Sequence, residues 1–255
     1  MAGTVLITGA SSGIGRALAL HYARQGHAIA LTGRDRTRLD STADECRRLG
    51  ANTQCALIDV RRRDAMAEWI GAIDRVTPID LVFANAGLMA GTPANGEIEP
   101  ADAGHGVIET NVLGVLNTVQ PLLPALMARG RGQIAIVSSI AAFIPLPDSP
   151  SYCASKSAVL TYGLSLRAAL AAHGVRVSVI CPGYVTTPMM MRESGPKAFV
   201  MPPERAVTCI VAGLARNKPV ISFPFFFALA TRLHGLMPDR LRRYILRGTR
   251  FTVGD

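Results

Sequence analysis

The sequence predicts an α/β fold in which one doubly wound parallel sheet is flanked by helices on both faces. Short apolar segments alternate with helix-like segments along the chain, an order typical of parallel strands joined by right-handed crossovers. Hydrophobic residues make up 49% of the 255 residues, charged residues 18% and aromatic residues 5%. That composition suits buried strands under closely packed helices. No repeat, low-complexity segment or linker divides the chain, so we expect one domain over residues 1–255.

The first segment predicts a strand, a glycine-rich turn and a helix. Residues 5–7 are an apolar strand, and residues 17–24 have helical periodicity that Gly26 closes. The turn between them contains Gly9, Gly13 and Gly15. Glycines let the backbone approach a ligand, and a helix N-terminus stabilises a pyrophosphate. We therefore interpret the turn as a nucleotide site; a simple tight turn is the alternative.

The second predicted strand, residues 27–32, bears on the choice of cofactor. An acidic residue at the end of this strand favours NAD through the ribose 2′-hydroxyl. Here Gly33 and Arg34 follow the strand, with Arg16 available from the first helix. A small residue beside a guanidinium suits a 2′-phosphate, so the sequence favours NADP(H) over NAD(H). The alternative is that Arg34 only begins a solvated turn.

Two further strand–helix units are predicted next. Helices over residues 36–49 and 65–76 alternate with strands over 53–58 and 81–83. Asp59, after the first of these strands, could accept a hydrogen bond from an adenine amino group or cap the following helix. The second strand runs into small residues at 84–87, which suit the wall of a cofactor site at the carboxyl end of a parallel strand.

The remaining elements are an apolar helix and three strands. The helix covers residues 105–127; Asn111 within it needs hydrogen-bond partners, and Pro121 and Pro124 are expected to kink or split it. Strands are predicted over 133–137, 175–180 and 220–223.

A tyrosine and a lysine lie four residues apart on the predicted helix that Gly174 ends. Positions i and i+4 share a helix face, so Tyr152 and Lys156 place a phenol beside an ammonium. A nearby positive charge should lower the phenol pKa from its usual value near 10. The pair is a candidate acid–base unit, with Ser139 as a candidate donor to a substrate oxygen. By itself, the spacing also occurs by chance.

Together these motifs resemble the classical short-chain dehydrogenase/reductase family. They run in the family's order from residue 4 to residue 187: Thr8–Gly15, Asp59, Asn85-Ala86-Gly87, Asn111, Ser139, Tyr152 with Lys156, and Pro182-Gly183 with Thr187. The resemblance implies a Rossmann-type fold and hydride transfer between NADP(H) and a ketone or secondary alcohol. Residues 1–187 would form the cofactor and catalytic core.

The resemblance also implies roles for single residues. Tyr152 would protonate a ketone oxygen, or act as the base in reverse, and Lys156 would lower its pKa and bind the nicotinamide ribose. Asn111 would hold a water relay to the lysine, and Ser139 rather than Ser138 would bind the substrate oxygen. The residues implied to line the cofactor are Gly9, Ser11, Ser12, Gly13, Ile14, Gly15, Arg34, Asp59, Val60, Asn85, Ala86, Gly87, Tyr152, Lys156, Pro182, Gly183, Val185 and Thr187.

One position departs from the family pattern. Ala84 replaces the family's usual asparagine. The hydrogen bonds of that first amide are therefore lost, which puts local bracing in doubt more than the chemistry.

Residues 188–255 are interpreted as a substrate-binding region with a basic, apolar C-terminal extension. Residues 189–200 and the cluster Phe225–Phe227 suggest an apolar pocket for a bulky or lipid-like carbonyl. Phe143, Ile144 and Leu146 give weaker support for the same pocket. Met189–Met191 fit a substrate lid or a buried helix start. The basic amphipathic stretch 232–250 fits a subunit interface, a pocket roof or peripheral membrane contact.

Composition and cysteine usage set the expected compartment. No signal peptide and no uninterrupted apolar run approaching about 20 residues is evident. The five cysteines are scattered without a CxxC pair, so we expect no disulfide framework and no metal site. Free cysteines suit a reducing compartment, and we expect a cytoplasmic protein, with peripheral membrane association as a further option. The net charge of +9 lacks a nucleic-acid motif, which favours a solvated face and an anionic cofactor. A homodimer or homotetramer is expected.

Three alternatives stay open at this point. The first is a 3-oxoacyl thioester reductase, with which the C-terminal extension fits less well. The second is a catalytically silent NADP(H)-binding sensor or scaffold, against which the Asn–Ser–Tyr–Lys set argues. The third is a membrane or nucleic-acid binder that uses the net charge.

Overall fold

The computed structural model describes residues 3–96, 98–234, 237–238, 240 and 251–254. Seven strands form one sheet in the order β3-β2-β1-β4-β5-β6-β7, and every neighbouring pair is parallel. The strands are β1 (Thr4–Thr8), β2 (Ala28–Gly33), β3 (Thr53–Leu57), β4 (Ile79–Ala84), β5 (Gly132–Val137), β6 (Val175–Pro182) and β7 (Val220–Phe223). The chain winds outward from β1 to β3 and then from β4 to β7, which confirms the predicted doubly wound, Rossmann-type sheet.

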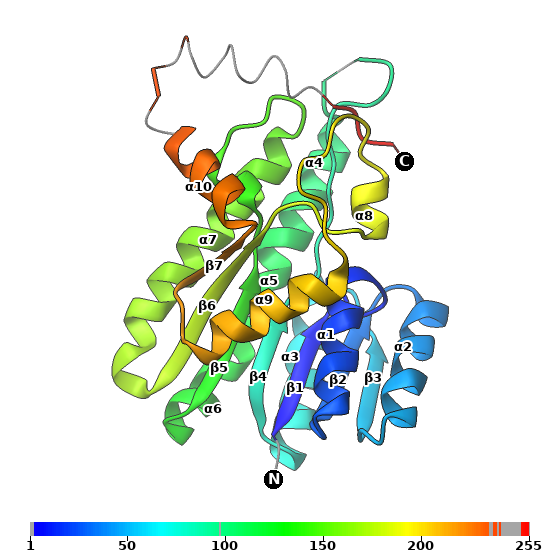
Figure 1. Cartoon of the computed structure of the whole chain (residues 1–255). Helices are drawn as coiled ribbons and strands as arrows, with labels where there is room; N and C mark the ends of the chain where they lie inside the picture. Colours follow the sequence, from blue (N-terminus) through cyan, green and yellow to red (C-terminus); the bar gives the residue numbers. More distant parts are fainter. Residues whose placement is uncertain (1–2, 97, 235–236, 239, 241–250, 255) are drawn as a thin grey trace.

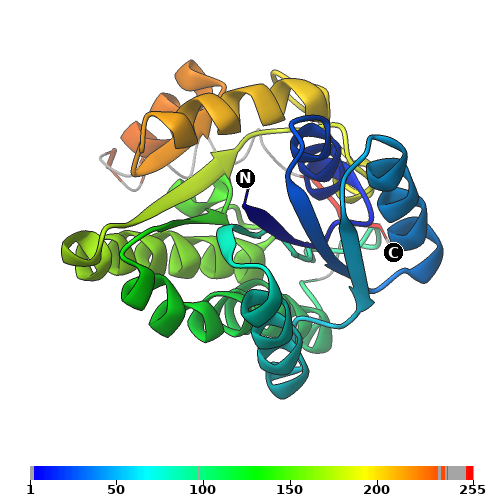
Figure 2. The same cartoon turned by 90° about the horizontal axis from the view of Figure 1, so that it is seen from below.

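Helices cover both faces of the sheet (Figures 1 and 2). One layer holds α1 (Gly13–Arg24), α2 (Arg36–Arg48) and α9 (Pro203–Ala215); the other holds α3 (Arg63–Val76), α5 (Gly114–Val119), α6 (Leu123–Arg129) and α7 (Pro150–Leu170). Successive strand residues point to opposite faces. Ile7 and Leu31 accordingly pack under α1 and α2, while Leu6 and Ala30 pack under the second layer.

A long helical run at residues 101–129 belongs to the second layer. It consists of α4 (Ala101–Ile108), a π-helical turn at Glu109–Leu113, α5, a 3-10 turn at Gln120–Leu122, and α6. The 3-10 turn contains Pro121, so the predicted split of this helix is confirmed. The run is long and apolar enough to cross a bilayer by composition alone. Its buried side chains, such as Val115 and Leu126, pack into the core instead.

The last described segments gather above the carboxyl ends of the strands (Figure 1). Here lie α8 (Pro188–Met191), α10 (Phe225–His234) and residues 251–254. Val253 N–H donates to the carbonyl of Thr92 at 2.9 Å and Ser194 N–H donates to the carbonyl of Thr252 at 2.8 Å. The chain end thereby joins two loops beside the sheet. Most of the basic stretch 232–250 lies outside the described residues.

Candidate active site

A cleft of about 700 Å³ opens at the carboxyl ends of the strands, beside the point between β1 and β4 where the strand order reverses. Open α/β sheets bind ligands at this point. Every residue predicted to bind the cofactor lines the cleft except Gly15, and so do Ser139, Tyr152 and Lys156 of the predicted catalytic set. Asn111 does not line it. The chain therefore brings motifs from the ends of six strands, β1 to β6, to one cavity.

The glycine-rich turn packs tightly against the end of β4. Gly9 has a φ of +66°, and a Cβ there would lie 2.8 Å from Ala86 Cα. A Cβ on Gly15 would run into the carbonyl of Gly9. Gly15 is therefore needed to close the turn rather than to face a ligand.

Asn85 and Thr8 brace this turn. Asn85 Nδ2 donates to the carbonyls of Thr8 and Gly9 at 2.9 and 3.2 Å. Thr8 Oγ1 accepts from the N–H groups of Asn85 and Ala86 at 3.0 and 3.1 Å. The bracing that Ala84 seemed to remove is thus supplied by its neighbours, without an amide at position 84.

Two arginines line the cleft where β2 ends. Arg34 is exposed and makes no hydrogen bond or ion pair with any other described residue that would occupy its guanidinium. Asp35 is already engaged, since its carboxylate accepts from the Arg38 N–H at 2.9 Å and from Arg38 Nε at 2.8 Å. The expectation that Arg16 is also available to the cofactor is wrong. Its Nη2 donates to both carboxylate oxygens of Glu45, at 2.6 and 2.7 Å, and Arg16 does not line the cleft.

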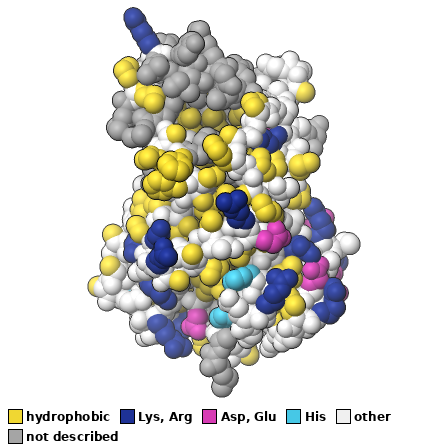
Figure 3. All heavy atoms as spheres, in the orientation of Figure 1, with side chains coloured by type: hydrophobic (Ala, Val, Ile, Leu, Met, Phe, Trp, Pro, Cys, Tyr) yellow, Lys and Arg dark blue, Asp and Glu magenta, His cyan; other side chains and the backbone are white. Residues whose placement is uncertain are grey.

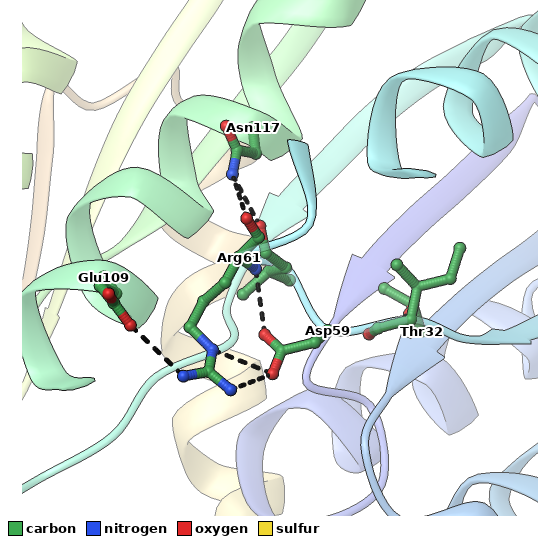
Figure 4. Close-up of polar contacts among 7 residues, drawn as sticks. Thr32, Asp59, Arg61, Glu109 and Asn117 are labelled. Carbon is green, nitrogen blue, oxygen red and sulfur yellow. Dashed lines mark hydrogen bonds and ion pairs between the residues drawn. The ribbon is translucent and has the colours of Figure 1, made fainter. Parts of the chain in front are cut away.

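A polar network holds the segment that follows β3 (Figure 4). Asp59 accepts from the N–H, Nε and Nη2 of Arg61 at 3.0, 3.0 and 2.7 Å, and Arg61 also reaches Glu109 at 3.3 Å. Asn117 Nδ2 donates to the carbonyl of Val60 at 2.9 Å. Burial would raise the pKa of Asp59, but the hydrogen bonds and charge of Arg61 lower it.

Asp59 therefore stays charged at the cleft wall. The alternative that it caps α3 is wrong, because Arg62 occupies the N-cap position.

Tyr152, Lys156 and Ser139 meet deeper in the cleft. Lys156 is only 4% exposed, and its Nζ lies 5.5 Å from the Tyr152 ring centroid and donates to the carbonyl of Val137 at 3.1 Å. The Ser138 hydroxyl donates to the Lys156 carbonyl at 2.7 Å, which fixes α7 to β5. Ser139 Oγ caps the short helix after it, accepting from the Ala141 N–H at 3.1 Å, and lines the cleft. The two neighbouring serines thus differ: Ser138 anchors the helix and Ser139 faces the cavity.

The acid–base balance of the pair differs from the expectation. Burial raises the pKa of Tyr152 to about 12, and a hydrogen bond with Ser139 opposes this only in part. Burial also lowers the pKa of Lys156 to about 8. The expected fall in the tyrosine pKa is therefore not found, because burial of the phenol outweighs the hydrogen bond that lowers its pKa. At neutral pH the phenol is a proton donor.

Asn111 acts behind the cleft wall. Its Oδ1 accepts from the Leu88 N–H at 2.7 Å, and its Nδ2 donates to the Leu88 carbonyl and to Ser155 Oγ, both at 2.9 Å. A Cβ on Gly87 would lie 3.3 Å from Asn111 Oδ1 and 3.4 Å from Lys156 Nζ. Asn111 therefore joins the loop after β4 to α7, beside the lysine. The hydrogen bonds of its side chain go to Leu88 and Ser155, the residues that it joins.

The substrate side of the cleft is mostly apolar. Its apolar lining includes Leu88, Met89, Ile140, Ile144, Leu146, Met189, Met190 and Phe251. No residue of α8 is buried, and Met191 is 72% exposed, so the methionines form a wall and rim rather than a core.

Some residues expected in this pocket lie elsewhere. Phe143 and Val200 do not line the cleft, and Phe225 and Phe226 are 68% and 80% exposed on α10. These four side chains therefore do not form the expected pocket, and the two phenylalanines are exposed to solvent on α10 instead. The side chain of Phe227 lies outside the described residues.

Sequence reasoning missed several lining residues. Tyr184 directly follows the predicted Pro182-Gly183 motif, so its position in the sequence could have indicated it. Nothing in the local sequence indicated Met89, Glu193 or Phe251. Tyr184 donates to Glu193 Oε1 at 2.8 Å. These residues reach the cleft only through the folding of loops that are distant in sequence.

No cysteine is among the described residues that line the cleft. Among the described residues, no group of three or more His, Cys, Asp or Glu side chains is placed to hold a metal ion. Cys153, next to Tyr152, is buried, and burial raises its pKa to about 11. It is therefore an unreactive thiol at neutral pH.

Comparison with known proteins identifies the architecture. Residues 3–197 match the model of the short chain dehydrogenase family. The chain is 38% identical to an uncharacterized oxidoreductase of Myxococcus xanthus over 93% of this chain and 94% of that protein. It is 30% identical to estradiol 17-beta-dehydrogenase 11 of Rattus norvegicus, over 92% of this chain and 80% of that one.

Two solved structures are also similar. A short-chain dehydrogenase from Sphingobium yanoikuyae in complex with NADPH has a TM-score of 0.80 and 27% identity, covering 97% of this chain and 96% of that chain. A short chain dehydrogenase from Mycobacterium paratuberculosis bound to NAD has a TM-score of 0.75 and 26% identity, covering 86% and 94%. These two similar structures thus contain different nicotinamide cofactors, NADPH in one and NAD in the other.

Proposed function

Because the chain belongs to the short-chain dehydrogenase family, we propose that it transfers hydride between NADP(H) and a ketone or secondary alcohol of apolar, lipid-like character. The observation that carries this is the convergence of Ser139, Tyr152 and Lys156 on a cleft that the glycine-rich turn also lines. The residues fit a dinucleotide: α1 aims its N-terminus at the cleft, and the turn before it has no side chain where the backbone must approach a phosphate. A bound NADPH would supply the hydride.

The side chains provide the proton and the orientation. In reduction, Tyr152 gives its hydroxyl proton to the substrate oxygen while the carbonyl carbon gains the hydride, so the ketone becomes an alcohol. Ser139 Oγ donates a hydrogen bond to the same oxygen and holds it near Tyr152. Lys156 binds the ribose beside the phenol and favours the transient phenolate by its charge. Asn111 keeps the loop after β4 in position for Lys156, as a positioning residue.

The preference for NADP(H) rests on the end of β2. Arg34 has its guanidinium available, and Arg38 lines the same edge of the cleft. Asp35, which follows Arg34 in the chain, is already paired with Arg38 at 2.8 Å. A 2′-phosphate would therefore meet the guanidinium of Arg34, whereas a ribose 2′-hydroxyl would find no free carboxylate at Asp35.

The proposed character of the substrate rests on the apolar side chains that line the same cleft as Tyr152. Leucine, isoleucine and methionine side chains line it, and methionine adapts to irregular apolar ligands. A relative whose name is estradiol 17-beta-dehydrogenase supports a bulky, lipid-like alcohol or ketone.

Nucleotide titration tests the cofactor proposal. We expect Arg34→Ala to weaken NADPH binding about 10-fold or more and to leave NADH binding within about twofold, since only the 2′-phosphate loses a charge-assisted partner. The matched control is Arg36→Ala, an exposed arginine that does not line the cleft. Equal losses for both nucleotides would contradict the preference. Ketone-dependent oxidation of NADPH that survives Tyr152→Phe would contradict the catalytic assignment.

We also propose a cytoplasmic homo-oligomer. All five cysteines are free, which suits a reducing compartment. Hydrophobic side chains gather over α10 (Figure 3), where Phe225 and Phe226 stack edge to face with ring centroids 5.6 Å apart. Exposed aromatic pairs of this kind support contact with another copy of the chain.

A further inference from the structure

The apolar wall of the cleft contains one polar pair outside the Ser–Tyr–Lys set. Glu193 is 7% exposed, and its Oε1 accepts the Tyr184 hydroxyl at 2.8 Å. Both residues line the cleft, among Met189, Met190 and Phe251. Carboxylates are rarely buried unless a cation or hydrogen-bond donors pair with them, because removing the charge from water is costly in free energy.

The surroundings of Glu193 do not neutralise it fully. Burial raises its pKa, while the hydrogen bond from Tyr184 and the charge of Lys197 lower it. Lys197 Nζ donates to the backbone carbonyl of Glu193 at 2.5 Å rather than to its carboxylate. Arg192 also lines the cleft, but its Nε donates to the carbonyl of Gly254 at 3.0 Å. The carboxylate has therefore no cation bound directly to it among the described residues.

The pair offers acceptors and no donor to a ligand. Because the Tyr184 proton is used by Glu193 Oε1, the side-chain atoms of this pair that can still bind a ligand are acceptors, namely the phenol oxygen and Oε2 of the carboxylate. Such a site accepts from a hydroxyl or an ammonium group and repels a carboxylate or phosphate.

The pair also shares the cavity with the catalytic tyrosine. The charge of Glu193 contributes to the raised pKa of Tyr152, and Tyr152 contributes to that of Tyr184. Because Tyr152, Tyr184 and Glu193 all line this one cleft, a single substrate molecule can contact the tyrosine with its carbonyl and the polar pair with another part.

We propose that the substrate carries a hydrogen-bond donor remote from its carbonyl, and that Glu193 and Tyr184 bind this donor and select for it. The inference rests on the proposed ketone reduction. It narrows the substrate class from apolar carbonyls to carbonyls with a distant hydroxyl or amino group, and it disfavours acidic substrates.

Matched ketones test this directly. The probes are 2-alkanones with chains of about 5 to 12 carbons that end in a methyl, a hydroxyl, an amino or a carboxyl group, each assayed with NADPH. The readout is the ratio of kcat/KM between the polar and the methyl-terminated ketone of equal length. At the chain length that spans the cavity we expect this ratio to rise for the hydroxyl or the amine, and the carboxylate to be the poorest substrate.

Variants assign the effect to the pair. Glu193→Gln keeps an acceptor for Tyr184 but presents an amide NH2 to the donor, so the hydroxyl-to-methyl ratio should fall roughly 10- to 100-fold through KM rather than kcat. Tyr184→Phe should lower the ratio by a smaller factor. Glu204→Gln, an exposed carboxylate on α9 outside the cleft, is the matched control and should keep the wild-type ratio.

The outcomes separate the two proposals. If wild-type protein oxidises NADPH with no ketone of the series, the proposed reductase activity itself fails. If it reduces these ketones without preferring any polar end, or if Glu193→Gln slows all ketones by the same factor, the pair only fixes the loop and the inference is overturned. A larger effect of the amine than of the hydroxyl would assign the donor as a cation.

Discussion

Replacing Asn85 by alanine tests whether the brace behind the glycine-rich turn sets cofactor affinity. The substitution removes the two hydrogen bonds from Nδ2 to the carbonyls of Thr8 and Gly9, at 2.9 and 3.2 Å. The bonds that Thr8 Oγ1 accepts from the backbone of Asn85 and Ala86 would persist, because they need no side chain at position 85. The change is thus confined to one face of the turn.

The expected loss follows from these two bonds. Each contributes about 0.5 to 1.5 kcal/mol net, so the free energy of unfolding should fall by about 1 to 3 kcal/mol. For a chain of this length that lowers Tm by roughly 2 to 6 °C. Since the turn that faces the phosphates loses its fixed orientation, NADPH and NADH should both bind roughly 5- to 30-fold more weakly.

Two measurements on the same protein check this prediction. Urea unfolding gives the stability, and fluorescence or calorimetric titration gives Kd for each nucleotide. The control is Gln133→Ala, which also removes an amide bonded to a backbone carbonyl, here Leu214 at 3.1 Å, but does not line the cleft. The control should lose stability and keep its affinity. An Asn85→Ala protein that is destabilised yet binds both nucleotides as the wild type does would refute the link between brace and cofactor.

Two other predictions concern pH and assembly. Lys156 has a pKa lowered to about 8 and loses its proton above that value, so the kcat/KM of the reductive direction should fall as pH rises through about 8. The kcat/KM of the oxidative direction should keep rising with pH, because the Tyr152 phenol, with a pKa of about 12, must lose its proton in that direction. A reductive profile that stays flat to pH 10 would contradict this. Changing both Phe225 and Phe226 to serine should reduce the mass measured by light scattering, because each buried ring contributes about 1.5 to 3 kcal/mol to a contact. An unchanged mass together with lost sedimentation on anionic vesicles would assign the surface to a membrane.

Local signals predicted the sheet and the catalytic helix. The central strands β1 and β5 are short apolar runs that are mostly buried, and such a pattern is visible without any knowledge of the fold. The spacing of Tyr152 and Lys156 follows from helical geometry alone. The helix α1 begins earlier than its periodicity indicated, at Gly13 rather than at Ala17, because its first turn consists of glycine-rich backbone with few apolar side chains to mark it.

Other features were missed or misjudged because they depend on partners far away in sequence. We did not predict α9, although it carries buried apolar residues at helical spacing, such as Val207, Ile210 and Leu214. Arg16 was expected to reach the cofactor, but Glu45 lies 29 residues further along and binds it. The pKa of Tyr152 depends on how completely the cleft is closed, which no spacing rule contains.

The apolar lining of the cleft depends most strongly on contacts between residues that are far apart in sequence. Phe251 lines the cleft, and its N–H is fixed by Asp148 Oδ2 at 3.1 Å, more than a hundred residues away. The residues that follow it pair with Thr92 and Ser194, so three loops and the chain end define one surface. Glu193 sits within that surface, bridged to Val253. The residues proposed to bind the cofactor and to catalyse lie at the ends of strands and on one helix, whereas the residues proposed to select the substrate are positioned by contacts among loops. Motifs in a sequence can therefore indicate the type of reaction, whereas the substrate depends on which loops come together around the cleft in the folded chain.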